Sequence, residues 1–220
     1  KILAYTGDIT TADLMSIPQG WAARIDPDKK NYQIKAFAEK IAGYQSRAAK
    51  DEKFYAIHLD VEPHTMGSKW DNNRAKYTQW MADMVVEARK QCDAIGVQLE
   101  YDVWSWFTEA DKVTDESGAT VNILDLMTKK CHALGVMSYY NTGAGQFDRA
   151  TNVELAYAKK NNCRLIAGTE TIKITPTNIT YYYSGKDKLV TEQGVLRQKL
   201  DGTGYNKLGG AIHHVYSWYE

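Results

Sequence analysis

The sequence predicts an α/β fold, namely a TIM-barrel-like (β/α)8 arrangement that fills residues 1–220 as a single domain. Three observations lead to this prediction. Strand-like and helix-like segments alternate along the chain, which is typical of parallel strands joined by right-handed helical crossovers. The chain contains no linker, low-complexity tract or break in composition. The expected strands end in acidic, histidine or aromatic residues, and barrel enzymes carry their functional side chains at those carboxyl ends.

Local patterns predict the elements in chain order. Strand-like apolar segments are residues 2–6, 21–26, 55–62, 97–104, 133–140, 165–171 and 210–217. Helical segments are residues 10–16, 32–49, 73–95, 121–131, 149–161 and 191–200. In the helix at 32–49, Ile34, Ala38 and Ile41 share one face, and Gly96 stands where the helix at 73–95 needs a C-cap.

Seven strands are one fewer than the eight that close a barrel. The eighth strand lies upstream of Lys1 or in a segment whose pattern does not reveal it. An open, doubly wound sheet is the alternative. Because no Gly-rich phosphate loop opens any expected helix, the nucleotide-binding versions of that sheet are disfavoured.

The segment Phe54-Tyr-Ala-Ile-His-Leu-Asp-Val-Glu-Pro-His64 is the most informative part of the chain. Side chains alternate along a strand, so His58, Asp60 and Glu62 are expected on one face. The other face is apolar and can pack on helices. Pro63 closes the strand because it lacks a backbone donor. Two carboxylates at a strand end are suited to acid/base chemistry.

Polar and aromatic residues also mark the ends of the later strands. The candidate site residues are His58, Asp60 and Glu62, then Glu100, Asp102 and Trp104, then Met137, Tyr139 and Asn141, then Glu170, and finally His214, Tyr216 and Trp218. Buried charges are costly unless they are paired or used. The alternative to a functional site is a network of mutually hydrogen-bonded groups without chemistry.

Each residue type suggests a role. Glu62 is the expected general acid, and Asp60 raises its proton affinity or shares its proton. Glu100 and Asp102 form a second carboxylate pair, or Glu100 is a structural partner of Arg24 or His58. Tyr139 donates a hydrogen bond to developing charge, or simply packs in the core. Trp218 is a sugar platform or a lid, His214 is favoured over His213, and His64 and His132 are expected in loops or at the surface.

Composition narrows the function further. Lys and Arg total 27, as do Asp and Glu, so no basic field for nucleic acid or anionic membranes is present. No apolar run is long enough to span a bilayer. The cysteines Cys92, Cys131 and Cys163 lie far apart in the sequence, each between an expected helix and strand, and are predicted to be buried, small core residues.

These residues resemble the family 18 glycoside hydrolases, the chitinase-like barrels. Asp60-Val-Glu62 matches the end of that family's Asp-x-x-Asp-x-Asp-x-Glu strand, and Met137-Ser-Tyr139 matches its later Met-x-Tyr-Asp strand. Residues 210–218 stand in place of its last strand, which carries a tryptophan. The resemblance implies that Glu62 protonates the glycosidic oxygen, that Asp60 orients the substrate's acetamido group as nucleophile, and that Tyr139 stabilises the cyclic intermediate.

The chain departs from the family pattern at several positions. Tyr55 and His58 replace the two earlier acids of the first motif, and Tyr140 replaces the Asp of the second. The chain also resembles a set of bacterial barrel proteins with a His-x-Asp-x-Glu-Pro strand. In a direct-displacement variant, Glu100, Asp102 or Glu170 would be the second carboxylate. Its distance from Glu62 would separate retention, at about 5–5.5 Å, from inversion, at about 6.5–9.5 Å.

The leading hypothesis is therefore a hydrolase, a glycosidase that needs no cofactor and acts on an oligo- or polysaccharide. A second is a metal-dependent barrel hydrolase, with ligands among His58, Asp60, Glu62, Glu170 and His214. A third is a non-catalytic carbohydrate-binding barrel. An extracellular or cell-surface location is expected from the first residue, which is Lys1 rather than Met, and from the family resemblance.

Overall fold

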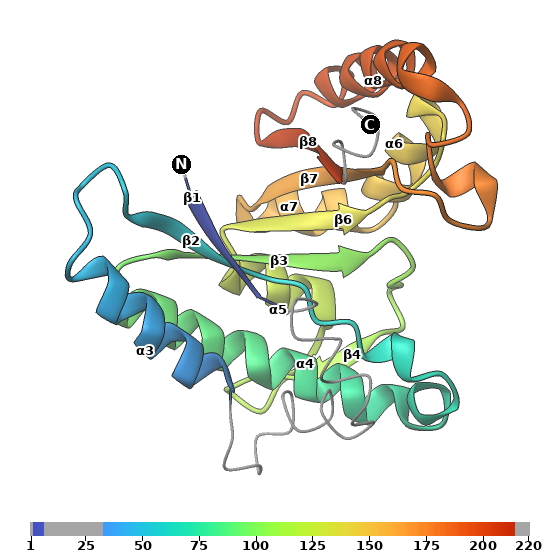
Figure 1. Cartoon of the computed structure of the whole chain (residues 1–220). Coiled ribbons are helices and arrows are strands. Elements are labelled where there is room, and N and C mark those ends of the chain that lie inside the picture. The colour runs from blue at the N-terminus through green and yellow to red at the C-terminus, as the bar shows by residue number, and fades with distance from the viewer. Residues whose placement is uncertain (1, 7–32, 214–220) are drawn as a thin grey trace. The chain divides into compact units, whose positions relative to one another are not determined.

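The computed structural model describes residues 2–6 and 33–213 (Figure 1). Their contacts divide the chain into two compact units. Unit 1 comprises Lys1–Asp102 and Glu109–His132, and unit 2 comprises Val103–Thr108 and Ala133–Glu220. The expected helix at residues 10–16 and the expected strand at residues 21–26 lie outside the described residues.

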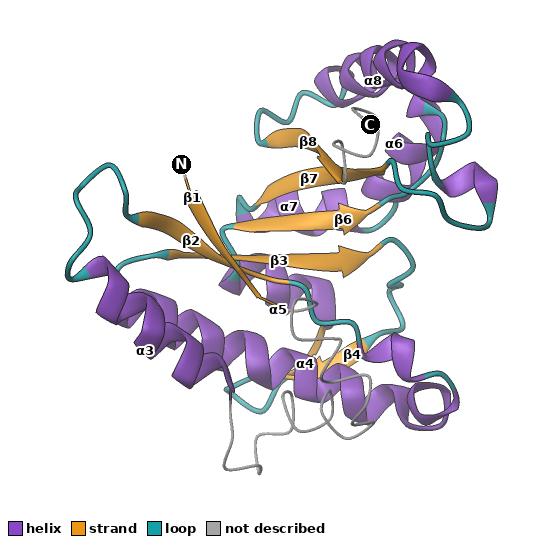
Figure 2. Ribbon diagram, viewed as in Figure 1, coloured by secondary structure: helices purple, strands orange, loops and turns teal. Residues whose placement is uncertain are grey.

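Unit 1 is built on parallel strands. Strand β1 (Ile2–Thr6) pairs with β2 (Phe54–Leu59), which pairs with β3 (Gln98–Trp104), a strand whose residues up to Asp102 belong to unit 1. Helix α3 (Gln33–Gln45) lies beside the long helix α4 (Ser68–Ile95), and Figure 2 shows both helices along these strands. The register places His58 opposite Glu100 on the neighbouring strand, so two ionisable residues meet within the sheet.

The core of unit 1 follows the expected periodicities. On β2, Ile57 is completely buried and Leu59 is 2 % exposed, as the apolar face of the strand predicts. On α4, the helical spacing buries Met81 and Val85 completely. Gly96 ends α4 in the left-handed conformation, with φ of 70°, which confirms it as the C-cap.

A small hairpin follows β3 and was not predicted. Strand β4 (Lys112–Thr114) pairs antiparallel with β5 (Thr120–Asn122), and Asn122 then caps helix α5 (Ile123–Lys130). The two strands are too short to show an alternating pattern. The turn depends on Asp115, whose carboxylate accepts hydrogen bonds from the backbone of Ser117 and Ala119.

Unit 2 repeats the parallel arrangement. Strand β6 (Ala133–Met137) pairs with β7 (Arg164–Glu170), which pairs with β8 (Leu208–His213). The helices of this unit are α6 (Gly143–Thr151), α7 (Glu154–Asn161) and α8 (Gly185–Gly202). The short 3-10 helices η1 and η2 are Pro63–Met66 in unit 1 and Thr177–Ile179 in unit 2.

Several helix boundaries differ from the sequence expectation: α3 ends at Gln45 rather than at 49, α4 begins at Ser68 rather than at 73, and α5 is shorter by three residues. Two differences are larger. The helix expected over residues 149–161 is two helices, because the chain leaves helical pairing between Thr151 and Glu154, where the Glu154 carboxylate accepts the backbone N–H of Val153. Helix α8 begins at Gly185 rather than at 191. The sequence did not reveal this start because the first turns carry few apolar residues and show no helical periodicity.

The described residues therefore form an α/β fold with parallel strands and six α-helices. All three cysteines are buried and free, as predicted: Cys92 is in the last turn of α4, Cys131 caps α5, and Cys163 precedes β7. None of the helices in the described part of the chain is both long and apolar enough to cross a membrane.

Candidate functional site

The Asp60-Val61-Glu62 segment follows β2 as a loop rather than as strand. The strand was expected to run to residue 62 but ends at Leu59. The reason is the helix η1 that begins at Pro63, because Glu62 is already its N-cap. The carbonyl of Glu62 accepts hydrogen bonds from the N–H and the hydroxyl of Thr65, at 3.1 and 2.7 Å. The backbone of Glu62 is thus held, while its side chain stays 25 % exposed.

Tyr101 anchors this loop from the neighbouring strand. Its hydroxyl donates a hydrogen bond of 2.9 Å to the carbonyl of Val61, the residue between the two acids. Tyr101 is completely buried on β3. Burial, followed by the nearby charge of Asp60, raises the pKa of Tyr101 well above its ordinary value. Tyr101 is therefore a neutral hydrogen-bond donor throughout the physiological pH range.

His58 lies between two carboxylates of β3. Its Nε2 is 2.9 Å from Asp102 Oδ2 and its Nδ1 is 3.4 Å from Glu100 Oε2. Burial by itself lowers the pKa of His58, but the hydrogen bonds and negative charges of Asp102 and Glu100 outweigh it and raise the pKa to about 10. The imidazole is therefore charged at neutral pH. This contact matches the alternative in which Glu100 is a structural partner of His58; Arg24 lies outside the described residues.

His64 lies on the other side of Glu62 in sequence. Its Nε2 is 3.9 Å from Glu62 Oε1, and its side chain is 29 % exposed. Burial lowers the pKa of His64 to about 4, so this imidazole is neutral at physiological pH. His132 has a structural contact instead, because its Nδ1 accepts the backbone N–H of Leu99 at 3.1 Å. His132 lies in the loop between α5 and β6, as expected, whereas His64 lies in the short helix η1.

In unit 2, Tyr139 lies against the glycine of β7. A Cβ at position 168 would come 3.1 Å from Tyr139 Cε1 and 2.9 Å from the carbonyl of Val136, so only glycine leaves room for the ring. Arg149 of α6 donates to the carbonyl of Tyr139 at 2.9 Å, which fixes the backbone there. Met137 is the last residue of β6.

The two other candidates of unit 2 are tied to the loop after β7. The N–H of Asn141 donates to the carbonyl of Asn178 at 2.8 Å. Glu170 is only 5 % exposed, and its Oε1 accepts the backbone N–H groups of Thr171 and Ile172 at 2.6 and 2.8 Å. These contacts already use the lone pairs of Glu170 Oε1 within the fold.

Trp104 is buried, and sequence reasoning missed its neighbours. Trp106 stacks on Trp104 and Phe107 packs against both rings. The Trp104-Ser105-Trp106 spacing, which extends the strand alternation by one step, was the signal that could have found Trp106. The remaining candidates, His214, Tyr216 and Trp218, lie outside the described residues.

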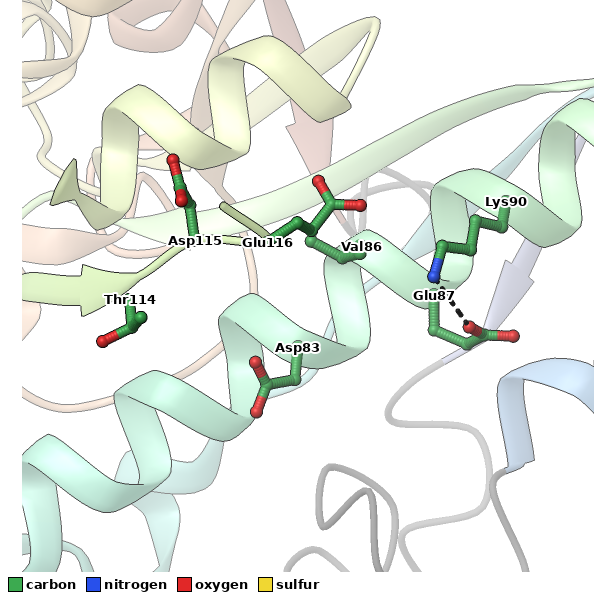
Figure 3. A pocket seen from close by; sticks show the side chains of 7 residues that line it. All are labelled: Asp83, Val86, Glu87, Lys90, Thr114, Asp115 and Glu116. Carbon is green, nitrogen blue, oxygen red and sulfur yellow. Dashed lines mark ion pairs between the residues drawn. The ribbon is translucent and has the colours of Figure 1, made fainter. Parts of the chain in front are cut away.

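Unit 1 also has a cavity of about 340 Å³ between α4 and the turn after β4. Figure 3 shows its lining side chains, which are Asp83, Val86, Glu87, Lys90, Thr114, Asp115 and Glu116. None was predicted to be functional. The carboxylates have partners in the fold: Glu87 pairs with Lys90 at 3.9 Å, Glu116 pairs with Lys130, and Asp115 holds the turn. These contacts account for the acidic lining without a ligand.

The metal hypothesis gains no geometric support from these residues. Within residues 2–6 and 33–213, no group of three or more His, Cys, Asp or Glu side chains is placed to hold a metal ion. Of the ligands that were considered, His58 directs both ring nitrogens at carboxylates, and His214 lies outside the described residues.

No family model and no curated protein matches this chain. Solved structures that it resembles are chitinase domains. A chitinase of Chromobacterium violaceum is 16 % identical, with a TM-score of 0.31, over 62 % of this chain and 36 % of that one. Catalytic domain 2 of the Group II chitinase of Ostrinia furnacalis is 14 % identical, with a TM-score of 0.37, over 78 % and 55 %.

A mutant of the same Ostrinia furnacalis domain, in complex with penta-N-acetylchitooctaose, is 12 % identical, with a TM-score of 0.33, over 92 % of this chain and 49 % of that one. The chain thus spans between about a third and just over half of the length of these chitinases.

Proposed function

We propose that this chain is a glycoside hydrolase-like enzyme that cleaves an O-glycosidic bond, with Glu62 as general acid assisted by Asp60. One observation carries the proposal: Glu62 is a partly exposed carboxylate on a fixed backbone, directly after a parallel strand. That is where barrel enzymes place their catalytic groups. The proposal includes closure of residues 1–220 into a (β/α)8 barrel and a location outside the cell, where polysaccharides occur.

In the proposed reaction, Glu62 gives its proton to the glycosidic oxygen as the bond to the anomeric carbon breaks. The electron pair of that bond leaves with the oxygen. A nucleophile on the substrate, an acetamido oxygen positioned by Asp60, bonds to the anomeric carbon. Water then replaces it, and Glu62 recovers a proton from that water. Tyr139 is proposed to donate a hydrogen bond to the cyclic intermediate.

The contacts of the other carboxylates favour this substrate-assisted route over direct displacement. Glu100 is 2 % exposed and pairs with the charged His58, as does Asp102. Glu170 is 5 % exposed and accepts two backbone N–H groups. A carboxylate with such partners is a weak nucleophile, because attack on the substrate would require it to give them up. Asp60, in contrast, is only half-buried and stands two positions before Glu62.

The decisive experiment measures reducing-end release from a panel of neutral polysaccharides and N-acetylhexosamine oligomers. Wild type is compared with Glu62→Gln and Asp60→Asn, and Glu39→Gln on the exposed side of α3 is the matched control. We expect Glu62→Gln to lose about 100-fold or more in kcat, as for other general acids, and Glu39→Gln to be unchanged. Cleavage by Glu62→Gln at the wild-type rate would mean that the acid is a different residue.

A second candidate function is non-catalytic carbohydrate binding. Tyr55 and His58, which replace the two earlier acids of the family 18 motif, favour this function. Both side chains have partners within the fold and are not catalytic carboxylates. Tyr55 bonds to Gln98, and His58 pairs with Glu100 and Asp102. Binding of an oligosaccharide by wild type and by Glu62→Gln, with cleavage by neither, would favour this function over the glycosidase.

A further inference from the structure

A buried polar network in unit 2 joins α6 to the carboxyl end of β7. Its centre is Gln146 of α6, which is completely buried. The Nε2 of Gln146 donates hydrogen bonds to the carbonyl of Gly168 at 3.1 Å and to the hydroxyl of Thr169 at 2.7 Å. Its Oε1 accepts the hydroxyl of Tyr181 at 3.1 Å and the Nε2 of Gln193 at 3.0 Å. The amide thus uses both of its donor hydrogens and both of its acceptor lone pairs.

The Gly168 carbonyl belongs to the backbone on which the Tyr139 ring lies. A Cβ at position 168 would come 3.1 Å from Tyr139 Cε1, so the ring occupies the space that the glycine leaves. The hydroxyl of Ser138 donates to the same carbonyl at 3.2 Å. Two side chains, one from α6 and one beside Tyr139, therefore fix the orientation of the Gly168 peptide. A change in that orientation would alter the surface under the ring.

Helix α6 also holds the backbone of Tyr139 itself. It lies against both β7 and α8 (Figure 1). The Nη1 of Arg149 donates to the carbonyl of Tyr139 at 2.9 Å, and the guanidinium lies 4.8 Å from the ring centroid of Tyr140. Gln146 and Arg149 are three positions apart and so share one face of α6. That face contacts the main chain of Tyr139 through Arg149 and the strand under its ring through Gln146.

We propose that Gln146 is a positioning residue for Tyr139, acting through the Gly168 peptide. A phenol can donate to a reaction intermediate only from one orientation, and small displacements of such a group reduce the rate strongly. Gln146 itself is buried and its hydrogen-bonding capacity is used within the fold, so it acts by holding the strand rather than by contacting a substrate. This inference rests on the proposed function for the role of Tyr139, and no sequence motif indicates Gln146.

The alternative is that the network stabilises unit 2 without orienting Tyr139. Gln146→Met keeps the length of the side chain and removes all four hydrogen bonds. Gln193→Met, the matched control in α8, makes the same chemical change and removes the bonds from Gln193 to Gln146 and to Thr169, at 3.0 Å each, but leaves the bond to the Gly168 carbonyl. If Gln146→Met does not fold, Gln146→Glu replaces it. An ionised Glu still accepts bonds from Tyr181 and Gln193 but cannot donate to Gly168.

The experiment combines two measurements on the full chain. Ring signals of ¹³C-labelled tyrosine are recorded by NMR, and the Tyr139 signal is assigned by its loss in Tyr139→Phe. Steady-state kinetics on the polysaccharide panel give kcat and KM. We expect Gln146→Met to shift or broaden the Tyr139 signal and to lower kcat about tenfold, with KM within about threefold of wild type. Gln193→Met should leave the Tyr139 signal in place and kcat within about threefold of wild type.

Each outcome separates this inference from the proposed function. An unchanged Tyr139 signal in a folded Gln146 variant would overturn the inference even if Glu62-dependent cleavage were found. An equal change of the signal in Gln193→Met would also overturn it, since the network would then act only on stability. If Tyr139→Phe loses activity while Gln146→Met keeps the wild-type kcat, the inference fails as well. If wild type cleaves nothing, the glycosidase is contradicted, and the Tyr139 signal alone supports or overturns the positioning by Gln146.

Discussion

The hydroxyl of Tyr101 donates a hydrogen bond of 2.9 Å to the carbonyl oxygen of Val61, and both residues are buried. Val61 separates Asp60 from Glu62, so one phenol on β3 holds the backbone of both proposed catalytic acids. Small displacements of a catalytic group reduce the rate strongly, because the reacting atoms must be aligned. Tyr101 is therefore a positioning residue in the proposed reaction.

Tyr101→Phe removes only this hydroxyl. We expect a loss of about 1–2 kcal/mol in the free energy of unfolding, because the Val61 carbonyl loses a buried partner. We also expect kcat to fall about tenfold with little change in KM, since the acids shift but remain present. Denaturant titration and steady-state kinetics measure the two effects.

The matched control is Tyr205→Phe in unit 2. Its hydroxyl also donates to backbone carbonyls, those of Cys163 at 2.6 Å and Ala158 at 3.0 Å. We expect a similar loss of stability without a change in kcat. If both variants lose stability equally and both retain full activity, Tyr101 has a structural role only.

The pairing of His58 with Asp102 and Glu100 predicts a pH-dependent stability. The pKa of His58 rises from 6.5 to about 10 on folding. The folded state therefore binds a proton more tightly than the unfolded chain does. The stabilisation is complete below pH 6.5 and is lost as the pH rises toward 10. At about 1.4 kcal/mol for each pKa unit, the loss over this shift is on the order of 5 kcal/mol.

His58→Gln tests this prediction. The free energy of unfolding of wild type should exceed that of the variant most strongly near pH 6.5, and the difference should shrink as the pH approaches 10. Denaturant titrations at several pH values measure the difference. A gap between wild type and variant that stays constant over this range would mean that His58 is neutral in the folded protein.

The contact between Gly168 and Tyr139 predicts the effect of a single added methyl group. In Gly168→Ala, the new Cβ would lie 2.9 Å from the Val136 carbonyl and 3.1 Å from the Tyr139 ring. We expect a loss of about 1–3 kcal/mol in stability, because strands β6 and β7 or the ring must move. If Tyr139 acts on the intermediate, kcat should fall as well.

Gly209→Ala on the neighbouring strand β8 is the control, since a Cβ at position 209 meets no atom of the described residues within 4 Å. Thermal unfolding and reducing-end release compare the two variants. Equal melting temperatures for the two alanine variants would show that the Tyr139 ring moves aside without cost.

Glu154 carries a carboxylate that is completely buried at the start of α7. Its Oε2 accepts the N–H of Val153 at 3.0 Å, while its Oε1 has no hydrogen bond to the described residues. Burial raises the pKa of Glu154 above its ordinary value of 4.5. The folded state is therefore stabilised while the Glu154 carboxyl is protonated. This contribution is complete below pH 4.5 and is lost as the pH rises through the pKa of Glu154 in the folded protein.

Glu154→Gln keeps the shape and removes the charge. We expect its free energy of unfolding to match or exceed that of wild type by about 1 kcal/mol at pH 7, and the advantage to vanish at low pH. Asp148→Asn, on the exposed side of α6, should leave stability unchanged. Strong destabilisation of Glu154→Gln at pH 7 would show that the charged carboxylate is needed by the fold.

Sequence patterns predicted most of the described elements because their signals are local. Helical spacing located α3, α4 and α5, and short apolar or alternating segments located β1, β2, β3, β6 and β7. The hairpin β4–β5 was missed, since three-residue strands show no alternation and depend on a turn held by Asp115. The end of β2 at Leu59 was also missed, because the competing η1 helix is fixed by Thr65 rather than by an apolar pattern.

The sequence by itself determined the parallel α/β class and the position of Asp60-Val61-Glu62 after a buried strand. Hydrophobic periodicity and the conformational effect of proline both act over a few neighbouring residues, so the local sequence contains them. Only the tertiary structure decided the state of the site. The β2–β3 register brings His58 to Glu100 and Asp102, and strand packing brings Tyr101 to Val61. These partners are about 40 positions apart in the chain, as for His58 and Glu100 at 42. Contacts at that separation are set by how the strands pair, which no local pattern encodes.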